Sequence, residues 1–523
     1  MKTVKTHQGT AYSRHVTLLL SALVVVLLIA LGAAPASALA SLPGHSVTPI
    51  SIDPTNLYGT NISALAVAAN GTLYAVHDDG YVYKVVNGAV TGQLATGLAG
   101  YNDSLALSPD GNTLYVGIDA YNPYGDGRLG IVLPVNTTAW TVGTPIVSGA
   151  GWVNALAVSP TNGTLYVAGP DKDVHEVVSG AVTGSVTLAH SADSLAISPD
   201  GSTLYVGDAS YGDVGVVTPV ATSSMTAATA ITTGAGWVNA LAVSPDGTKL
   251  YVAGPDGEVI PVATATATVG TAMPTGEANP GIGALAVSPD GTTIYAGAAG
   301  SGKVYPIAAA TSTVGSPIAT SATAIKSLAT ADGIAYAGGN DGYVYEIINT
   351  YTLTYTAGAH GSITGTSPQT VNYGADGSAV TAVPATGYHF TGWSDSVATA
   401  TRHDTDVTAD VTVTASFAWT KLTTKLTITS DRTTAHRGQM VTFSGTISPS
   451  MANGTHVIVE IRKSGSSTWS TLATRGTYGS GHWSYAYKIS LTHSRGTFHV
   501  RVRFAGNAKY RGSVSASTRL VIK

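Results

Sequence analysis

The sequence predicts an all-β protein in which a seven-bladed β-propeller is followed by two smaller strand-rich domains. A unit of roughly 43 residues recurs seven times in the first two thirds of the chain, which is the spacing of propeller blades. Each copy places two short apolar runs on either side of a tight turn, and the C-terminal residues alternate apolar and polar side chains. Both patterns are typical of β-strands.

The repeat is clearest in the segment GAGWVNALAVSP, which occurs twice without change, at residues 149–160 and 234–245. Each copy carries one leucine in its first apolar run, and successive leucines lie 39 to 51 residues apart. The seven repeat leucines are Leu65, Leu105, Leu156, Leu195, Leu241, Leu285 and Leu328. Such internal periodicity takes precedence over any local interpretation of the same residues.

Each copy predicts one four-stranded blade. An apolar run such as ALAVS meets a Pro-Asp-Gly turn and a second run such as TLYVAG, the pattern of a β-hairpin. In the first copy the predicted strands are 63–68, 72–76, 81–86 and 90–94. The seventh copy supplies only three strands, so we expect the extended segment 47–52 to add the fourth and close the ring.

The repeats also resemble a known family. The segments VSPDGTKLYVAG at 243–254 and LSPDGNTLYVG at 107–117 are similar to bacterial YVTN-type β-propeller repeats, found in surface-layer, secreted and lactonase-like proteins. The resemblance covers residues 45–349 and implies a propeller fold. It implies no particular activity, because propellers host many unrelated functions.

The N-terminus predicts export. Lys2, Lys5 and Arg14 precede an uncharged apolar run from Val16 to about Leu31, which is followed by small-x-small cleavage sites. We therefore expect residues 1–40 to be a signal peptide and no membrane span to remain after cleavage. An uncleaved anchor is the alternative, because the run is nearly long enough to cross a bilayer.

The chain has no cysteine, which excludes disulfides, cysteine-ligated zinc, iron–sulfur clusters and thiol nucleophiles. Only 10% of its residues are charged, against about 25% in ordinary proteins. A low charge content with many Gly, Ser and Thr residues is typical of β-rich surface proteins.

Residues 351–418 depart from the repeat pattern. Their marks are His360-Gly361-Ser362-Ile363, Gly387-Tyr388-His389-Phe390 and Gly392-Trp393. They resemble the divergent internalin-type B-repeat, or Listeria–Bacteroides repeat, whose members are small spacer modules on bacterial surface proteins. Among the few large side chains available, Phe390, Trp393 and Phe417 are expected to form the core.

Residues 421–523 predict a β-sandwich of about seven strands and resemble bacterial immunoglobulin-like (Ig-like) domains by their layout. They hold 15 Lys and Arg residues against Asp431 and Glu460, a balance of +13, whereas residues 41–420 hold 7 basic and 27 acidic residues, a balance of −20. A basic domain of this kind attracts polyanions. In an exported protein, anionic envelope polymers are more plausible partners than nucleic acid, and a merely solvated surface is the alternative.

The variable residues of the repeats are expected at the upper propeller face, just ahead of each first strand. The candidate ligand-binding residues there are Trp152, Asn154, Trp237, Asn239, Asp103, Asp193 and Tyr101. Aromatic rings beside amides and carboxylates suit a glycan or a peptide. The alternative is that the tryptophans pack between blades and the Asp and Asn side chains cap turns.

These candidates predict no catalytic site. No histidine falls on the inner ring positions, so neither a Ser-His-Asp set nor the acidic, His or Arg cluster of lactonase-like and lyase propellers is assembled. The Asp and Asn oxygens offer at most a weak Ca²⁺ site, and no other cofactor is expected. The sequence favours a secreted or cell-surface binding or adhesion protein without enzymatic activity. A lactonase-like or lyase-type enzyme and a purely structural envelope component are the alternatives.

Overall fold

A computed structural model describes residues 42–52, 61–97, 100–121, 128–208, 214–450 and 454–523. The described residues form strands and turns without any helix, so the predicted all-β class is confirmed. The chain divides into two compact units: the first runs to Tyr351 and includes segments 371–375 and 406–409, and the second contains the remaining residues to Lys523. The predicted signal peptide lies outside the described residues.

The repeats fold into seven sheets, and each repeat supplies the first three, antiparallel strands of one sheet. The seventh sheet also includes three strands that lie beyond the repeats. The first sheet consists of β2 (Ile62–Val67), β3 (Leu73–His77), β4 (Tyr81–Val86) and β5 (Ala89–Ala95), and the second of β6 (Gly100–Leu107), β7 (Thr113–Tyr121), β8 (Arg128–Asn136), β9 (Thr141–Val142) and β10 (Ile146–Val147). The third consists of β11 (Ala155–Val158), β12 (Leu165–Ala168), β13 (Asp173–Val178) and β14 (Ala181–Thr187). The fourth consists of β15 (Ala192–Ile197), β16 (Thr203–Asp208), β17 (Val216–Ala221), β18 (Thr226–Ala227) and β19 (Ile231–Thr232).

The last three sheets follow the same plan, but the seventh takes its outermost strand from the start of the described chain. They consist of β20 (Ala240–Val243), β21 (Lys249–Ala253), β22 (Glu258–Ala263), β23 (Thr268–Val269) and β24 (Met273–Pro274); β25 (Ile282–Val287), β26 (Thr293–Ala298), β27 (Lys303–Ala308), β28 (Thr313–Val314) and β29 (Ile318–Ala319); and β30 (Ile325–Ala331), β31 (Ile334–Gly339), β32 (Tyr343–Ala357) and β1 (Gly44–Ser51).

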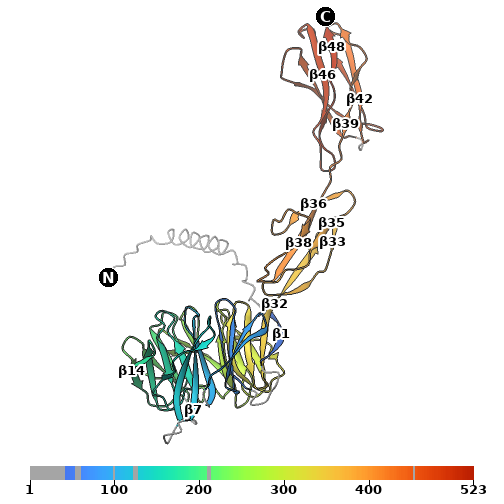
Figure 1. Ribbon diagram of the computed structural model, residues 1–523. Coiled ribbons are helices and arrows are strands. Elements are labelled where there is room, and N and C mark those ends of the chain that lie inside the picture. Colours follow the sequence, from blue (N-terminus) through green and yellow to red (C-terminus); the bar gives the residue numbers. More distant parts are fainter. Residues whose placement is uncertain (1–41, 53–60, 98–99, 122–127, 209–213, 451–453) are drawn as a thin grey trace, which may run out of the picture. The chain divides into compact units, whose positions relative to one another are not determined.

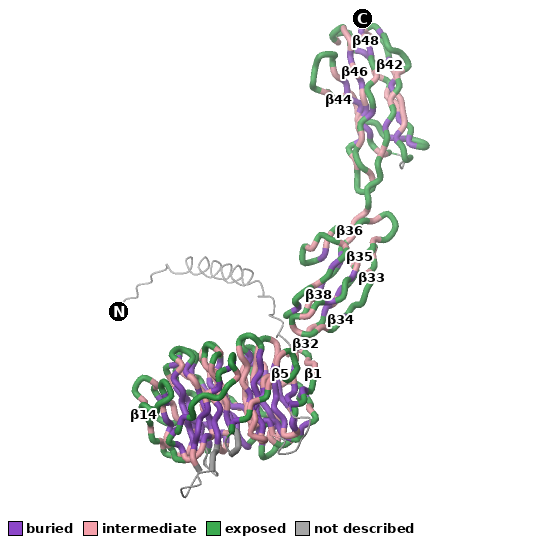
Figure 2. The backbone as a smooth tube through the Cα atoms, viewed as in Figure 1, coloured by how far each residue is buried: buried purple, intermediate pink, exposed green. Residues whose placement is uncertain are grey.

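The seven sheets are arranged in a cycle, which we call the ring. Their first strands contact one another in the order β2, β6, β11, β15, β20, β25 and β30, and β30 in turn contacts β2. At this last joint the Ser327 hydroxyl donates to the carbonyl oxygen of Ile62 at 2.9 Å. The core lies largely between neighbouring sheets, as where Tyr251 and Met273 of the fifth pack with Ile294 of the sixth, and Figure 2 shows the buried residues concentrated along the strands.

The predicted pairing of the N-terminal segment with the last sheet is confirmed. Strand β1 runs antiparallel to β32, with Gly44 opposite Thr350 and Ser51 opposite Tyr343, and Figure 1 shows the two strands side by side. The strand begins three residues earlier and ends one residue earlier than the predicted segment 47–52. This pairing covers an edge of β32 that would otherwise expose its backbone groups.

The Pro-Asp-Gly turns have one common hydrogen-bond pattern. In the fifth sheet, the Ser244 hydroxyl donates to Asp246 Oδ1 at 2.6 Å, the Thr248 amide donates to the same oxygen at 3.0 Å, and Gly247 has a φ of +71°. Glycine adopts this left-handed conformation without a steric penalty. The same pattern occurs in the fourth sheet, where the hydrogen bond from Ser198, followed by that from Ser202, lowers the pKa of Asp200 to about 2.

The residues after the ring form a small module whose strands are β33 (Gly361–Thr364), β34 (Gln369–Asn372), β35 (Val380–Pro384), β36 (Tyr388–Trp393), β37 (Thr401–Arg402) and β38 (Val411–Trp419). Strand β32 continues into it without a break and pairs in parallel with β38. Trp393 is buried, as predicted. Phe390 and Phe417 are only partly buried and meet edge to face, while Leu353, Val380 and Ala415 supply much of the core.

The C-terminal domain has two sheets around one core. Its strands are β39 (Lys425–Leu426), β40 (Thr429–Ser430), β41 (Thr434–Ala435), β42 (Met440–Ser448), β43 (His456–Lys463), β44 (Ser470–Gly476), β45 (His482–Lys488), β46 (Gly496–Phe504), β47 (Ser513–Val514) and β48 (Thr518–Ile522). Strands β39, β40, β42 and β45 form one sheet region and the other six strands form a second sheet. Trp483 and Phe443 of the first pack with Val459 and Val500 of the second.

Candidate functional site

The two GWVN segments are fixed to the ring by their backbones. The Asn154 amide donates to the carbonyl oxygen of Ala168, and the Asn239 amide donates to that of Ala253, both at 3.0 Å. A β-carbon at Gly254 would lie 2.1 Å from the carbonyl oxygen of Trp237. Only glycine allows such a close approach of two backbones, so the repeated glycine after the second strand serves this packing.

The asparagine side chains join neighbouring sheets. Asn154 Nδ2 donates to the carbonyl oxygen of Ala192 at 3.0 Å and to Asp193 Oδ1 at 2.9 Å, and both acceptors belong to the first strand of the next sheet. Asn239 Nδ2 makes the corresponding bond to the carbonyl oxygen of Ile282 at 3.0 Å. These bonds favour a structural role for the two asparagines, but as links between sheets and not as the turn caps that were the alternative in the sequence.

The two tryptophans are half-buried. The indole Nε1 of Trp237 donates to Asn239 Oδ1 at 2.6 Å, so the Trp237 side chain contacts the asparagine that joins the two sheets. Trp152 is also half-buried beside the first strand of its sheet. Each tryptophan is therefore partly packed into the protein and partly accessible to a ligand.

Asp193 lies at the rim of the ring and is exposed to solvent. The surrounding protein and the charge of Asp208 raise its pKa, against the hydrogen bond from Asn154. Asp193 Oδ1 accepts a hydrogen bond from the neighbouring sheet, and Asn239 Oδ1 accepts one from Trp237 of its own segment. Both oxygens therefore have structural partners and match a Ca²⁺ ligand set less well. The side chains of Tyr101 and Asp103 lie outside the described part of the structure.

A small cavity on the fourth sheet was missed by the sequence analysis. It has a volume of about 210 Å³, and its lining includes His190, Ser191 and Asp208. His190 Nδ1 lies 3.7 Å from Asp208 Oδ2. The two residues are 18 positions apart, His190 just before strand β15 and Asp208 at the end of strand β16, so no local motif marks them. The volume lies below the roughly 300 Å³ of ordinary small-molecule sites.

A turn between the second and third strands recurs around the ring. The Tyr83 hydroxyl donates to Asp79 at 2.5 Å in the first sheet, and Tyr345 hydrogen-bonds Asp341 in the seventh. In the third sheet His175 takes the tyrosine's place, and its Nε2 lies 3.0 Å from Asp171 Oδ2. The nearby cluster of Asp171, Asp173 and His175 is therefore accounted for by the architecture of this turn.

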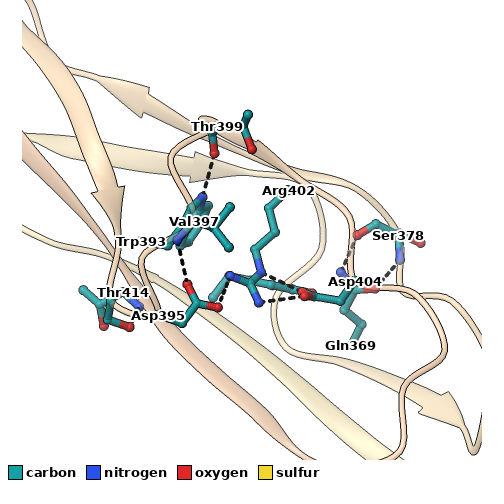
Figure 3. Close-up of polar contacts among 11 residues, drawn as sticks. Gln369, Ser378, Trp393, Asp395, Val397, Thr399, Arg402, Asp404 and Thr414 are labelled. Carbon is teal, nitrogen blue, oxygen red and sulfur yellow. Dashed lines mark hydrogen bonds and ion pairs between the residues drawn. The ribbon is translucent and has the colours of Figure 1, made fainter.

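The strongest polar network lies in the module after the ring (Figure 3). The buried Arg402 guanidinium donates to Asp404 at 2.6 and 2.7 Å and to Asp395 at 2.5 Å, and the Tyr355 hydroxyl donates to Asp404 at 2.6 Å. Trp393 Nε1 donates to the carbonyl oxygen of Thr399 at 3.0 Å in the same region. With every charge of the network paired, its role is to hold the loops of the module together.

Burial alone would raise the pKa of Asp395 and of Asp404, but their hydrogen bonds to Arg402 outweigh it, so both carboxyl pKa values lie below the ordinary range. The pKa of Tyr355 is raised by burial and by its bond to Asp404. The network therefore stays ionised at neutral pH. The network was not predicted from the sequence, because only aromatic residues were expected to form the core of this module.

Residues 351–421 match the family model of the divergent InlB B-repeat domain. The match agrees with the resemblance noted for residues 351–418, and a domain of this type fits a bacterial surface or extracellular protein. A search of curated proteins found no match for the chain. Within the described residues, no helix has the length and apolar character needed to cross a membrane.

Proposed function

We propose that the protein is exported and acts as a non-catalytic binding protein of the bacterial envelope. In this proposal the ring is a seven-bladed YVTN-type β-propeller whose upper face meets an extracellular ligand. The module at 351–421 is a spacer, and the Ig-like C-terminal domain associates with anionic envelope polymers. The separation of charge carries the proposal: residues 421–523 have a balance of +13 and residues 41–420 a balance of −20.

The closed cycle of sheets supports the propeller, because seven sheets whose first strands contact one another in turn leave only short, protected sheet edges on the inside. The B-repeat supports an extracellular location. The partial exposure of Trp152 and Trp237 supports a ligand on the upper face, since a tryptophan side chain offers a large apolar surface together with a polar N–H group.

A propeller hydrolase or lyase is the second candidate, and the pair His190–Asp208 favours it. A histidine beside a carboxylate can act as a general base. The other described histidines of the ring are engaged elsewhere or buried: His77 lies beside Asp79, and His175 bonds Asp171. A single histidine–carboxylate pair at 3.7 Å in a small cavity supports catalysis less well than the separation of charge supports binding.

The test combines localisation with ligand arrays. We expect the native chain to be found on the outside of intact cells and to be removed by surface proteolysis, whereas a chain confined to the cytoplasm would contradict the proposal. On glycan and peptide arrays, the Trp152→Ala/Trp237→Ala double variant is expected to lose signals given by the wild type. Identical array profiles would refute a ligand site at these tryptophans.

A further inference from the structure

One outer sheet face of the C-terminal domain is strongly basic. The buried residues of strand β46 alternate with partly exposed ones, so Phe498, Val500 and Val502 face the core while Arg501 and Arg503 face outward. Strands β43 and β48 flank β46 on its two sides. We call the outward residues Arg462, Arg501, Arg503 and Arg519 the arginine face.

Strand register brings these side chains into rows. Arg462 of β43 lies opposite His499 of β46, and His499 lies opposite Arg519 of β48. In the next row Arg501 lies opposite Glu460. Neighbouring strands are about 4.8 Å apart and outward residues of one strand about 7 Å apart, so four guanidinium groups share a compact flat area.

Trp469 holds two of these arginines in place. The guanidinium carbon of Arg501 lies 4.0 Å from the centre of the Trp469 ring, and that of Arg462 lies 4.8 Å from it. Arg462 Nη1 donates to the carbonyl oxygen of Ser466 at 3.3 Å, while its Nε is buried without a hydrogen-bond partner. Stacking on a ring fixes the plane of a guanidinium and leaves its outward N–H groups available.

The arginine face keeps a positive charge after its internal pairing. Glu460 is buried and bonds Arg501 Nε at 2.7 Å and Arg503 Nε at 3.2 Å. Four arginines with one glutamate leave a balance of +3. The only other acidic residue of the domain is Asp431, whose side chain lies 3.7 Å from Arg432, so it does not neutralise the face.

We propose that the arginine face binds a linear envelope polymer, other than a nucleic acid, whose backbone carries phosphodiester groups. This inference rests on the proposed function, which places the domain among envelope polymers. Guanidinium groups bind phosphate oxygens through two parallel hydrogen bonds, and a flat sheet with rows of them suits an extended chain with repeated charges. The described residues of β43, β46 and β48 expose no large apolar side chain. Beside them, Trp469 is half-buried under two arginines and Val514 is exposed opposite Arg503, so the face offers little apolar surface to insert into a bilayer.

The test uses the full chain and two variants of equal charge. The variant Arg462→Gln/Arg503→Gln/Arg519→Gln leaves Arg501 to pair with Glu460. The control Lys421→Gln/Lys425→Gln/Lys488→Gln removes three charges from exposed positions outside the arginine face. Binding of labelled poly(glycerol phosphate) is measured by fluorescence anisotropy at several salt concentrations, with melting curves to verify folding.

We expect the arginine variant to bind at least tenfold more weakly and the control to bind within about threefold of the wild type. If each phosphate contact contributes about 0.7 to the slope of log K against log salt, as in single-stranded nucleic acids, losing three contacts lowers the slope by about 2. An equal loss in both variants would mean that net charge alone decides binding and would overturn the proposal, as would a wild-type chain that does not bind.

A second variant keeps the proposal testable if the glutamine substitutions disturb folding. Arg462→Lys/Arg503→Lys/Arg519→Lys retains the charge but lacks the paired donors, so we expect binding about fivefold weaker, and unchanged binding would contradict the proposal. Tighter binding of the wild type to phosphatidylglycerol vesicles or duplex DNA than to the polymer would also overturn it. A chain that binds the polymer but stays inside the cell would refute the proposed function and leave this inference intact.

Discussion

Closure of the ring by strand β1 gives a sharp prediction for the substitution Ile50→Ala. Ile50 is 5% exposed and packs in one cluster with Leu65, Tyr336 and Val344, which belong to the first and seventh sheets. Truncating a buried isoleucine to alanine costs about 2 to 5 kcal/mol. At about 2.1 cal/mol/K per residue, unfolding a ring of roughly 300 residues has an entropy near 0.6 kcal/mol/K. The melting temperature of the ring should therefore fall by about 3 to 8 °C.

Differential scanning calorimetry of the full chain measures this change, with Thr48→Ala as the matched control. Thr48 lies on the same strand but is exposed, so its truncation should change stability by less than about 0.5 kcal/mol. Deleting residues 44–51 should lower the melting temperature further and speed hydrogen exchange of the amides in 343–350. An unchanged ring transition in both Ile50→Ala and the deletion would refute closure by β1.

Three further predictions concern single side chains. Burial lowers the pKa of His45 from 6.5 to about 4, so between these pH values the unfolded chain binds a proton that the folded ring does not. The free energy of unfolding should therefore fall by about 1 to 3 kcal/mol as the pH is lowered from 6.5 to 4, as measured by pH-dependent melting. The variant His45→Phe should lack this contribution. Arg402→Met leaves the partly buried Asp404 with Tyr355 but without its ion pair, and should cost the 351–421 module about 3 kcal/mol in chemical denaturation. The exposed Arg475→Met should cost almost nothing, and equal effects would contradict the assigned network. Asn239→Ala removes a hydrogen bond between the fifth and sixth sheets and should lower the free energy of unfolding of the ring by about 1 to 2 kcal/mol. Denaturant titration measures this change, and an unchanged denaturation midpoint would disprove it.

The sequence predicted those parts of the fold that depend on local pattern. The Pro-Asp-Gly turns place the first hairpin of the second, fourth, fifth and sixth sheets, because residues such as Asp246 and Gly247 specify the turn by their own chemistry. The recurrence of the leucines fixed the number of sheets, and the missing strand of the seventh copy pointed to the N-terminal segment, which pairs with β32.

The parts that could not be predicted depend on contacts between strands far apart in the chain. Asn154 has a partner in the next sheet, 39 positions away, so its role in joining sheets is invisible in its own repeat. Arg462 and Arg519 approach one another only through the register of two strands with β46. The sequence showed that the C-terminal domain is basic, but not that four arginines share one face.

Sedimentation with purified anionic cell walls tests the central claim most directly. The full chain should pellet with the walls at low ionic strength and be released by about 0.5 M salt, where the screening length falls to about 4 Å. Release should require less salt for the Arg462→Gln/Arg503→Gln/Arg519→Gln variant than for the lysine control. A chain that stays in solution at low salt, or remains bound at every salt concentration, would contradict electrostatic retention on the envelope.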